Sequence, residues 1–208
     1  MKIGILISGR GSNMAAIIEA VKSGAIPDSE VAVVISDKAD AAGLEKARST
    51  GVEAIVVARD GRTRVDHDKE IAAELTARGV ELVCLAGYMR LLSADFIRAF
   101  PDRIVNIHPS LLPAFPGLDV QQQAIDHGVK VSGCTVHFVN EDLDAGPIIL
   151  QRTVSVNDGD DAASLAARIL EQEHPAYIEA VRRITAGEIS VSGNQVIRRQ
   201  AHIGNTNS

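Results

Sequence analysis

Short apolar runs alternate along the first half of the chain with segments whose apolar residues recur at helical spacing. The apolar runs predict buried strands at Ile3–Ile7, Val31–Ile35, Ala54–Val57, Leu82–Ala86 and Ile104–Ile107. The intervening segments predict helices at Asn13–Lys22, Ala41–Ser49, Asp66–Ala77 and Ser93–Phe100. Short connections and right-handed crossovers would arrange this α/β repeat as an open, mostly parallel sheet with helices on both faces.

The pattern changes after residue 108. A proline-rich loop leads to a short predicted helix near Gln121–His127 and then to two β runs, Val131–Val139 and Pro147–Val156. The Gly-containing acidic loop that joins these two runs is typical of an antiparallel connection. We therefore expect an antiparallel C-terminal extension of the parallel sheet.

The last part of the chain predicts a long helix over Ala162–Thr185, kinked or broken at Pro175, followed by a weak strand pair. No internal repeat or low-complexity linker divides the chain. Residues 1–199 are therefore expected to form a single domain, and residues 200–208 a polar, mobile tail.

Composition and charge exclude several classes of protein. Of the 208 residues, 46% are hydrophobic but only 3% are aromatic, so the core must consist mainly of aliphatic side chains, as suits a buried parallel sheet. A net charge of −6 and the lack of a basic cluster interleaved with aromatic residues argue against nucleic acid as a partner. Cys84 and Cys134 lie in apolar runs without the spacing of a metal or redox motif, and we expect buried, reduced thiols.

The N-terminal apolar run passes directly into a glycine turn. It is too short for a signal peptide or a membrane span. We therefore expect a cytoplasmic protein without a membrane partner.

A polar pair ends the fifth predicted strand, at the position where open α/β sheets place their chemistry. Asn106 and His108 are two residues apart, so their side chains would face one cavity, and Pro109 would stop the strand. An Asn amide can donate to a developing oxyanion, and an imidazole can give or take a proton. The pair could form half of an acyl-transfer site, or it could only satisfy backbone groups at the strand end.

The segment Ser-Gly-Arg-Gly-Ser-Asn, residues 8–13, lies between the first predicted strand and the first helix. Backbone N–H groups and the helix dipole can hold a phosphate there. The segment lacks the Walker Gly-Lys-Ser/Thr ending, and Met14 stands where the dinucleotide fingerprint has its third glycine. It therefore favours a phosphate on a metabolite smaller than NAD, or a tight turn in which Ser12 or Asn13 caps the helix.

Residues 87–92 follow the fourth predicted strand and would lie at the same edge of the sheet as the glycine turn and His108. Their backbone groups could form hydrogen bonds to a flat heterocycle, while Leu92 supplies an apolar wall. Alternatively, Met89 and Leu92 are core residues and Arg90 is a solvated surface charge.

Asp144 lies in the acidic loop between the two later β runs. It could fold back over His108 and favour the charged imidazolium, or it could be an ordinary turn residue. His137 could join this site or be a satisfied strand histidine. The three side chains could also form a facial metal triad, although the sequence does not establish the necessary geometry.

In combination and order, four motifs resemble those of the folate-dependent phosphoribosylglycinamide formyltransferase family. They are Ser-Gly-Arg-Gly-Ser-Asn at 8–13, Leu-Ala-Gly-Tyr-Met-Arg at 85–90, Asn-Ile-His-Pro-Ser-Leu-Leu-Pro at 106–113 and Asp-Leu-Asp-Ala-Gly-Pro-Ile at 142–148. The similarity extends over nearly residues 1–187. It implies a Rossmann-like fold and formyl transfer from 10-formyltetrahydrofolate to the amine of 5-phosphoribosylglycinamide in de novo purine (IMP) biosynthesis, without a metal.

The resemblance also implies three groups of site residues. The catalytic residues would be Asn106, His108 and Asp144. Phosphoribosylglycinamide would be bound by Gly11, Ser12 and Asn13 at its phosphate, by Glu173 at its ribose, and by Gly87 and Pro109. The formyl folate would be bound by Arg64, Met89, Arg90, Leu91, Leu92, Asn106, Val139, Asn140, Glu141, Asp142, Leu143 and Asp144. Both partners would be small molecules, and the protein would be a monomer or a homodimer.

Two departures from the family pattern concern substrate affinity more than reaction type. Many relatives place histidine in the segment occupied here by Leu118–Gln121, and Leu170 stands where family members can offer a polar substrate contact. Two alternative functions also follow. The chain could be another formyltetrahydrofolate-using enzyme, either a hydrolase or a transferase with a different amine, or a noncatalytic module that binds a phosphometabolite.

Overall fold

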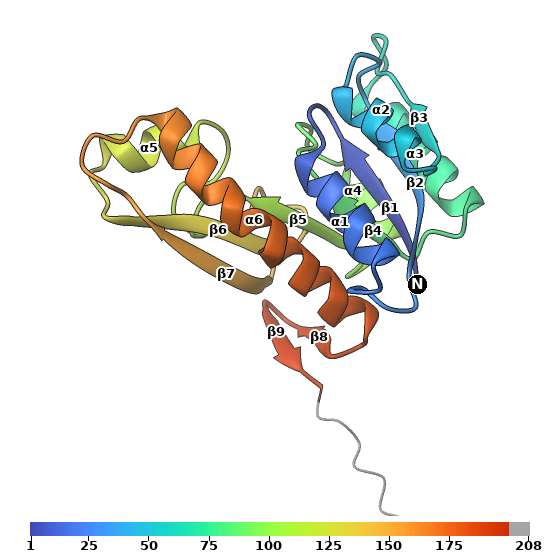
Figure 1. Cartoon of the computed structure of the whole chain (residues 1–208). Coiled ribbons are helices and arrows are strands. Elements are labelled where there is room, and N and C mark those ends of the chain that lie inside the picture. The colour runs from blue at the N-terminus through green and yellow to red at the C-terminus, as the bar shows by residue number, and fades with distance from the viewer. Residues whose placement is uncertain (200–208) are drawn as a thin grey trace, which may run out of the picture.

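A seven-stranded sheet, in the order β3-β2-β1-β4-β5-β6-β7, forms the centre of the molecule (Figure 1). The computed structural model describes residues 1–199, so the predicted tail lies outside the described residues. The strands are β1 (Lys2–Ile7), β2 (Glu30–Ser36), β3 (Ala54–Val56), β4 (Leu82–Leu85), β5 (Ile104–His108), β6 (Val131–Phe138) and β7 (Ile148–Ser155). The first five pair in parallel, and β6 and β7 extend the sheet in antiparallel fashion, as the sequence predicts.

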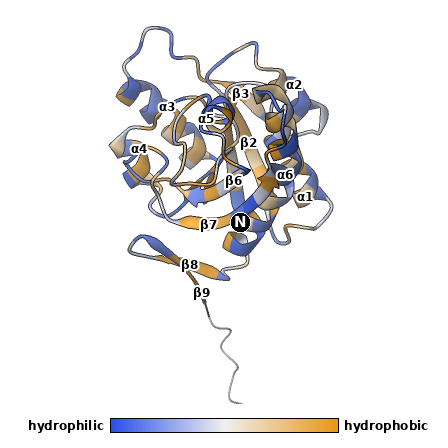
Figure 2. Ribbon diagram, turned by 90° about the vertical axis from the view of Figure 1, so that its left-hand side faces the viewer, coloured by the Kyte–Doolittle hydropathy of each residue, from blue (hydrophilic) through white to orange (hydrophobic). Residues whose placement is uncertain are grey.

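Helices cover both faces of this sheet. They are α1 (Ser12–Lys22), α2 (Ala42–Ser49), α3 (Arg64–Ala77), α4 (Ala94–Ala99), α5 (Val120–Asp126) and α6 (Ala162–Thr185). Alternate residues of β1 point to opposite faces: Ile5 packs in the cluster that contains α1 and α6, and Leu6 packs in the cluster that contains α3 and α4. The helices carry both hydrophobic and hydrophilic residues, as expected for elements that meet the sheet on one side and solvent on the other (Figure 2).

The C-terminal elements lie where the sequence pattern places them, with one difference. Helix α6 runs from residue 162 to residue 185 with Pro175 inside it, so the break considered at this proline is absent. It begins at a capping box in which Asp161 Oδ1 accepts from the Ser164 backbone N–H at 2.8 Å. The predicted weak strand pair is present as a separate antiparallel hairpin, β8 (Ile189–Ser192) and β9 (Gln195–Arg198). None of the helices within residues 1–199 is long and apolar enough to cross a membrane.

Among the helix starts, that of α3 differs most from the prediction. Helix α3 begins at Arg64, one half-turn before the predicted Asp66. The reason is the side chain of Thr63, which accepts a hydrogen bond from the Asp66 backbone N–H at 3.1 Å and so caps an earlier turn.

Tyr177 on α6 ties the helix to two central strands. Its side chain is fully buried, and its hydroxyl lies 3.0 Å from the carbonyl oxygens of both Leu85 and Val105. Leu85 ends β4 and Val105 lies inside β5, so one hydroxyl bridges these strands close to the edge where both of them end. Because a buried hydroxyl must find an acceptor, this contact fixes α6 relative to the sheet.

Replacing Tyr177 by Phe should lower the free energy of unfolding by about 1 kcal/mol, because it removes a buried hydrogen bond while keeping the ring. Tyr88 supplies the matched control, since its buried hydroxyl has no hydrogen-bond partner among the described residues. Tyr88→Phe should therefore be neutral or slightly stabilising. Urea unfolding of both variants measures the difference, and an equal loss in the two would contradict the role given to the Tyr177 hydroxyl.

Candidate active site

The ends of three parallel strands meet at one edge of the sheet and carry the predicted motifs. The glycine turn follows β1, the 87–92 segment follows β4, and His108 is the last residue of β5. Two hydrogen bonds join the first two segments: the Ser8 N–H donates to the Gly87 carbonyl, and the Met89 N–H donates to Ser8 Oγ, both at 3.0 Å. The edge of the sheet therefore holds these segments in one site, as expected for an open α/β fold.

Asp144 lies against His108, as the sequence predicts. Its Oδ2 is 3.5 Å from His108 Nδ1, and the same oxygen accepts from the Gly117 backbone N–H at 2.9 Å. Asp144 has a positive φ of 49°, a conformation that Asp tolerates better than most residues. Its carboxylate thereby joins the 115–117 loop to the histidine, and the alternative of an ordinary turn residue is wrong.

Both ring nitrogens of His108 face oxygen acceptors. Nδ1 faces the Asp144 carboxylate, and Nε2 lies 2.9 Å from the carbonyl oxygen of Phe115. The side chain is only 5% exposed, so water competes little for these positions. Each ring nitrogen that carries a hydrogen can therefore donate to an oxygen, Nδ1 to Asp144 and Nε2 to Phe115.

His137 completes the cluster, and the sequence left its role open. Its Nδ1 lies 2.8 Å from the carbonyl oxygen of Phe138, the next residue. Its Nε2 lies 3.3 Å from Asn106 Nδ2 and 3.9 Å from Asp144 Oδ1. Burial lowers the pKa of His137 more than the nearby Asp144 raises it, so the ring is neutral at pH 7. With Nδ1–H donating to Phe138, Nε2 accepts from the Asn106 amide and orients it.

The sequence also permits a facial metal triad of two histidines and one aspartate in this cluster. His108, His137 and Asp144 do come together. However, no group of three or more His, Cys, Asp or Glu residues in the described part of the chain is placed to hold a metal ion. The arrangement instead joins a carboxylate, two imidazoles and an amide through hydrogen bonds and close charge contacts.

The glycine turn leaves its helix N-terminus open. Gly11 is the N-cap of α1, with a positive φ of 68° and no side-chain cap, so the predicted alternative of a Ser12 or Asn13 cap is wrong. The N–H groups of the first turn of α1 consequently have no capping side chain to accept from them, which is the arrangement that binds anions. Helix α2 supports the turn, because the Gly43 N–H donates to the Gly9 carbonyl at 3.0 Å.

A side chain at position 43 would crowd the glycine turn. A Cβ there would lie 2.6 Å from Ile7 Cδ1 and 3.0 Å from the Gly9 carbonyl oxygen. The close approach of α2 to the turn therefore depends on Gly43.

Glu173 reaches the same turn from α6. The Asn13 Nδ2 donates to Glu173 Oε2 at 2.7 Å, while the buried Asn13 Oδ1 has no partner among the described residues. Burial raises the pKa of Glu173, and the Asn13 hydrogen bond opposes that shift. Gly87 and Pro109 lie at the adjoining strand ends, and Leu170 is half-buried one turn earlier on α6.

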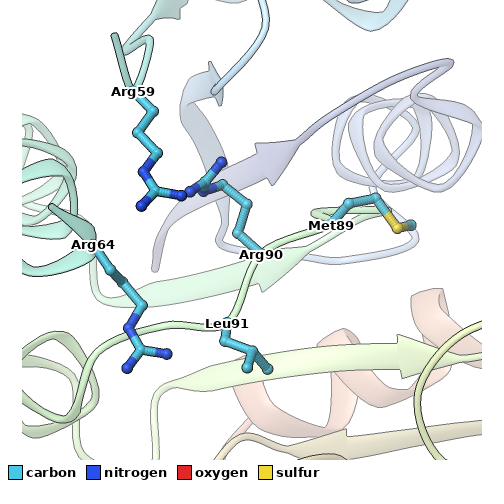
Figure 3. A pocket seen from close by; sticks show the side chains of 5 residues that line it. All are labelled: Arg59, Arg64, Met89, Arg90 and Leu91. Carbon is cyan, nitrogen blue, oxygen red and sulfur yellow. The ribbon is translucent and has the colours of Figure 1, made fainter. Parts of the chain in front are cut away.

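A cavity of about 550 Å³ adjoins the 87–92 segment and is lined by Arg59, Arg64, Met89, Arg90 and Leu91 (Figure 3). Met89 is 65% exposed, so the alternative of a core residue is wrong for it. Arg90 is not a fully solvated charge either, because its Nη1 lies 3.6 Å from the buried Asp37 Oδ2. Arg59 was not anticipated, although its position in the basic loop just before Arg64 was a signal for it.

The other residues predicted for this side of the site fall into two groups. Leu92 and Val139 pack, half-buried, against the core cluster that contains α3 and α4 and do not line the cavity. Residues Asn140–Leu143 form an exposed loop after β6, in which Asn140 Oδ1 accepts from the Asp142 N–H and Glu141 pairs with Arg98. Leu143 is 54% exposed at the tip of this loop.

Because the pKa of Glu173 is raised, we expect the stability of the folded protein to depend on pH. The folded protein keeps this proton to a higher pH than the unfolded chain does. The stability that protonation contributes is therefore fully present below the unfolded pKa and is lost as the pH rises through the folded pKa. The Gln side chain does not titrate, so the free energy of unfolding of Glu173→Gln should rise relative to that of the wild type as the pH increases above the usual range of a Glu carboxyl, about pH 4.

Urea unfolding of the wild type and the Gln variant at several pH values tests this expectation. Glu171→Gln is the control, because Glu171 is exposed on the same helix. A pH-independent difference between the wild type and Glu173→Gln would show that burial does not shift this carboxyl group.

Comparisons with known proteins agree with this geometry. The formyl transferase family model matches residues 1–181. The chain is 42% identical to the phosphoribosylglycinamide formyltransferase of Escherichia coli (strain K12), over 93% of this chain and 92% of that protein. It is 45% identical to the trifunctional purine biosynthetic protein adenosine-3 of Drosophila melanogaster, of whose length it spans only 14%. The crystal structure of glycinamide ribonucleotide transformylase 1 from Symbiobacterium toebii superposes with a TM-score of 0.94 at 52% identity, covering 96% of this chain and 94% of that one.

Proposed function

Because this chain belongs to the formyl transferase family, we propose that it transfers the formyl group of 10-formyltetrahydrofolate to the amine of 5-phosphoribosylglycinamide. The products are the formylated amine and tetrahydrofolate, and the reaction is a step of de novo purine synthesis. The observation that carries this proposal is the buried contact of His108 with Asp144, beside the Asn106 amide, between an open helix N-terminus and an arginine-lined cavity.

The amine substrate binds at the glycine turn. Its phosphate accepts hydrogen bonds from the N–H groups at the start of α1, around Gly11, Ser12 and Asn13. Glu173, held 2.7 Å from Asn13, accepts from a ribose hydroxyl. The glycinamide amine then extends along the strand ends, past Gly87 and Pro109, toward His108.

The formyl folate binds from the other side of His108. Its pteridine lies near the Asn140–Asp144 loop and Asn106, and the remainder of the molecule extends past Met89 and Leu91 toward Arg64 and Arg90. Apolar side chains beside guanidinium groups suit a ligand with an aromatic middle and a carboxylate end. This arrangement brings the formyl carbon to the amine at the end of β5.

The reaction requires an oxyanion stabiliser and a path for one proton. The amine nitrogen forms a bond to the formyl carbon, whose oxygen becomes negatively charged in the tetrahedral intermediate. The second N–H of the Asn106 amide donates to that oxygen, and the protonated ring of His108 donates to it as well once its Nε2 leaves the Phe115 carbonyl. The intermediate collapses when the bond from carbon to the folate nitrogen breaks, and the proton lost by the amine goes to that nitrogen, directly or through water.

Two neighbours support these roles. Asp144 Oδ2 lies 3.5 Å from His108 Nδ1, close enough to accept from the ring and to help move the proton. His137, neutral because of its burial, accepts from the Asn106 amide and turns it toward the site. No step requires a metal, and we propose a cytoplasmic enzyme, monomeric or homodimeric, that acts on small molecules rather than on nucleic acid or a membrane.

Replacing Asn106 by Ala should lower kcat on the order of 10²-fold, because it removes a donor to the oxyanion. Asn194→Ala is the control, since Asn194 is exposed in the turn between β8 and β9. Near-normal turnover by Asn106→Ala would make the assignment of this residue wrong.

A coupled assay with both substrates, following the formylated amine and tetrahydrofolate separately, tests the function itself. Wild-type protein should form the two products in equal amounts, and His108→Ala should form neither at a comparable rate. Release of tetrahydrofolate without the formylated amine would instead indicate a hydrolase or a different amine acceptor. An absence of both products would indicate a binding module.

A further inference from the structure

Ser110 lies two residues after His108 and is only 1% exposed. Its hydroxyl faces two backbone carbonyl oxygens, that of Ala114 at 2.6 Å and that of Phe115 at 3.0 Å. A hydroxyl carries one hydrogen, so it can satisfy only one of these acceptors fully. The Phe115 oxygen is also the acceptor that lies 2.9 Å from His108 Nε2. One carbonyl oxygen therefore faces two donors, His108 and Ser110.

The backbone around Ser110 is fixed by two side chains of the antiparallel extension, one on β6 and one on β7. The fully buried Thr135 Oγ1 donates to the Ser110 carbonyl at 2.7 Å and accepts from the Leu112 N–H at 3.0 Å. Gln151 Nε2 donates to the Leu112 carbonyl at 2.8 Å and to Thr135 Oγ1 at 3.0 Å. Thr135 also pairs with His108 in the register of β5 and β6. These contacts give the Ser110 hydroxyl a defined position relative to His108.

The position of the Phe115 carbonyl is fixed as well. Phe115 has a positive φ of 53°, which is uncommon for a residue with a large side chain and persists only where the surrounding contacts impose it. Its half-buried ring lies 5.2 Å from the ring of His127, measured between centroids. Two residues later, the Gly117 N–H donates to the Asp144 carboxylate. The Phe115 carbonyl therefore keeps its place when the side chain of His108 turns.

Formyl transfer requires His108 Nε2 to leave this carbonyl and to donate to the oxyanion. A buried acceptor that loses its donor destabilises the state in which the loss occurs. On the basis of the proposed function, we propose that Ser110 is a positioning residue whose hydroxyl turns from the Ala114 carbonyl to the Phe115 carbonyl as His108 turns to the substrate. Ala114 is exposed, so water can replace the hydroxyl there. Ser110 thereby lowers the barrier to the release of His108.

Steady-state kinetics of Ser110→Ala test the effect on the reaction. Without the hydroxyl, the Phe115 carbonyl lacks a donor only after His108 has turned, so kcat should fall on the order of tenfold while KM for both substrates stays within about twofold. Ser110→Thr keeps a hydroxyl and should recover most of the lost kcat. Ser132→Ala is the matched control, because Ser132 is also buried but lies in β6 outside the proposed site, and it should keep the wild-type kcat. A wild-type kcat in Ser110→Ala, or a loss confined to KM, would overturn the proposal.

A double-mutant cycle in the free protein tests the shared carbonyl without any turnover. Ser110→Ala and His108→Leu each leave the Phe115 carbonyl one donor, whereas the double variant leaves it none. The urea midpoint of the double variant should therefore lie below the value that the sum of the two single shifts predicts. Additive shifts would overturn the proposal. Such a non-additive cycle in a protein whose wild type transfers no formyl group would count against the proposed function alone, because the coupling between the two side chains does not depend on turnover.

Discussion

Strand β5 is the element on which the site depends, because its two edges pair in opposite senses. It runs parallel to β4 and antiparallel to β6. The parallel edge places the end of β5 beside the segment that follows β4, where the cavity lies. The antiparallel edge sets Asn106 opposite His137, and it makes β6 run on into the loop that carries Asp144. Phe138, the last residue of β6, pairs with Val105 near the start of β5, so the loop after β6 must fold back for Asp144 to reach His108 at the strand end.

Burial determines how the charged groups of the site behave. Burial lowers the pKa of His137, of whose surface almost none meets water, and it raises the pKa of the half-buried Glu173. His108 is just as buried, but acceptors face both of its nitrogens. The two imidazoles therefore differ in their hydrogen-bond partners. His137 Nε2 accepts from the Asn106 amide, whereas both nitrogens of His108 face oxygen acceptors.

The sequence predicts the sheet, its antiparallel extension and the meeting of the strand ends, because these follow from local periodicity and from the geometry of parallel strands. It also predicts the approach of Asp144 to His108, through a resemblance of motifs. It does not predict that Gly11 replaces a side-chain cap, since that depends on a backbone dihedral angle. Nor does it place Leu92 and Val139 against the core or Arg59 in the cavity, because each of these depends on how loops pack after the sheet has formed.

Helix α6 carries Glu173 and Tyr177, which lie four residues apart and therefore on the same face. One touches the glycine turn, and the other fixes the two strands that end in the site. The residue proposed to contact the substrate and the residue that fixes the strands therefore lie on one turn of helix α6, so a sequence change that shifts the helix disturbs both at once. Anyone redesigning this protein for a different amine would have more freedom in the loops that end at the sheet edge than on this face of α6.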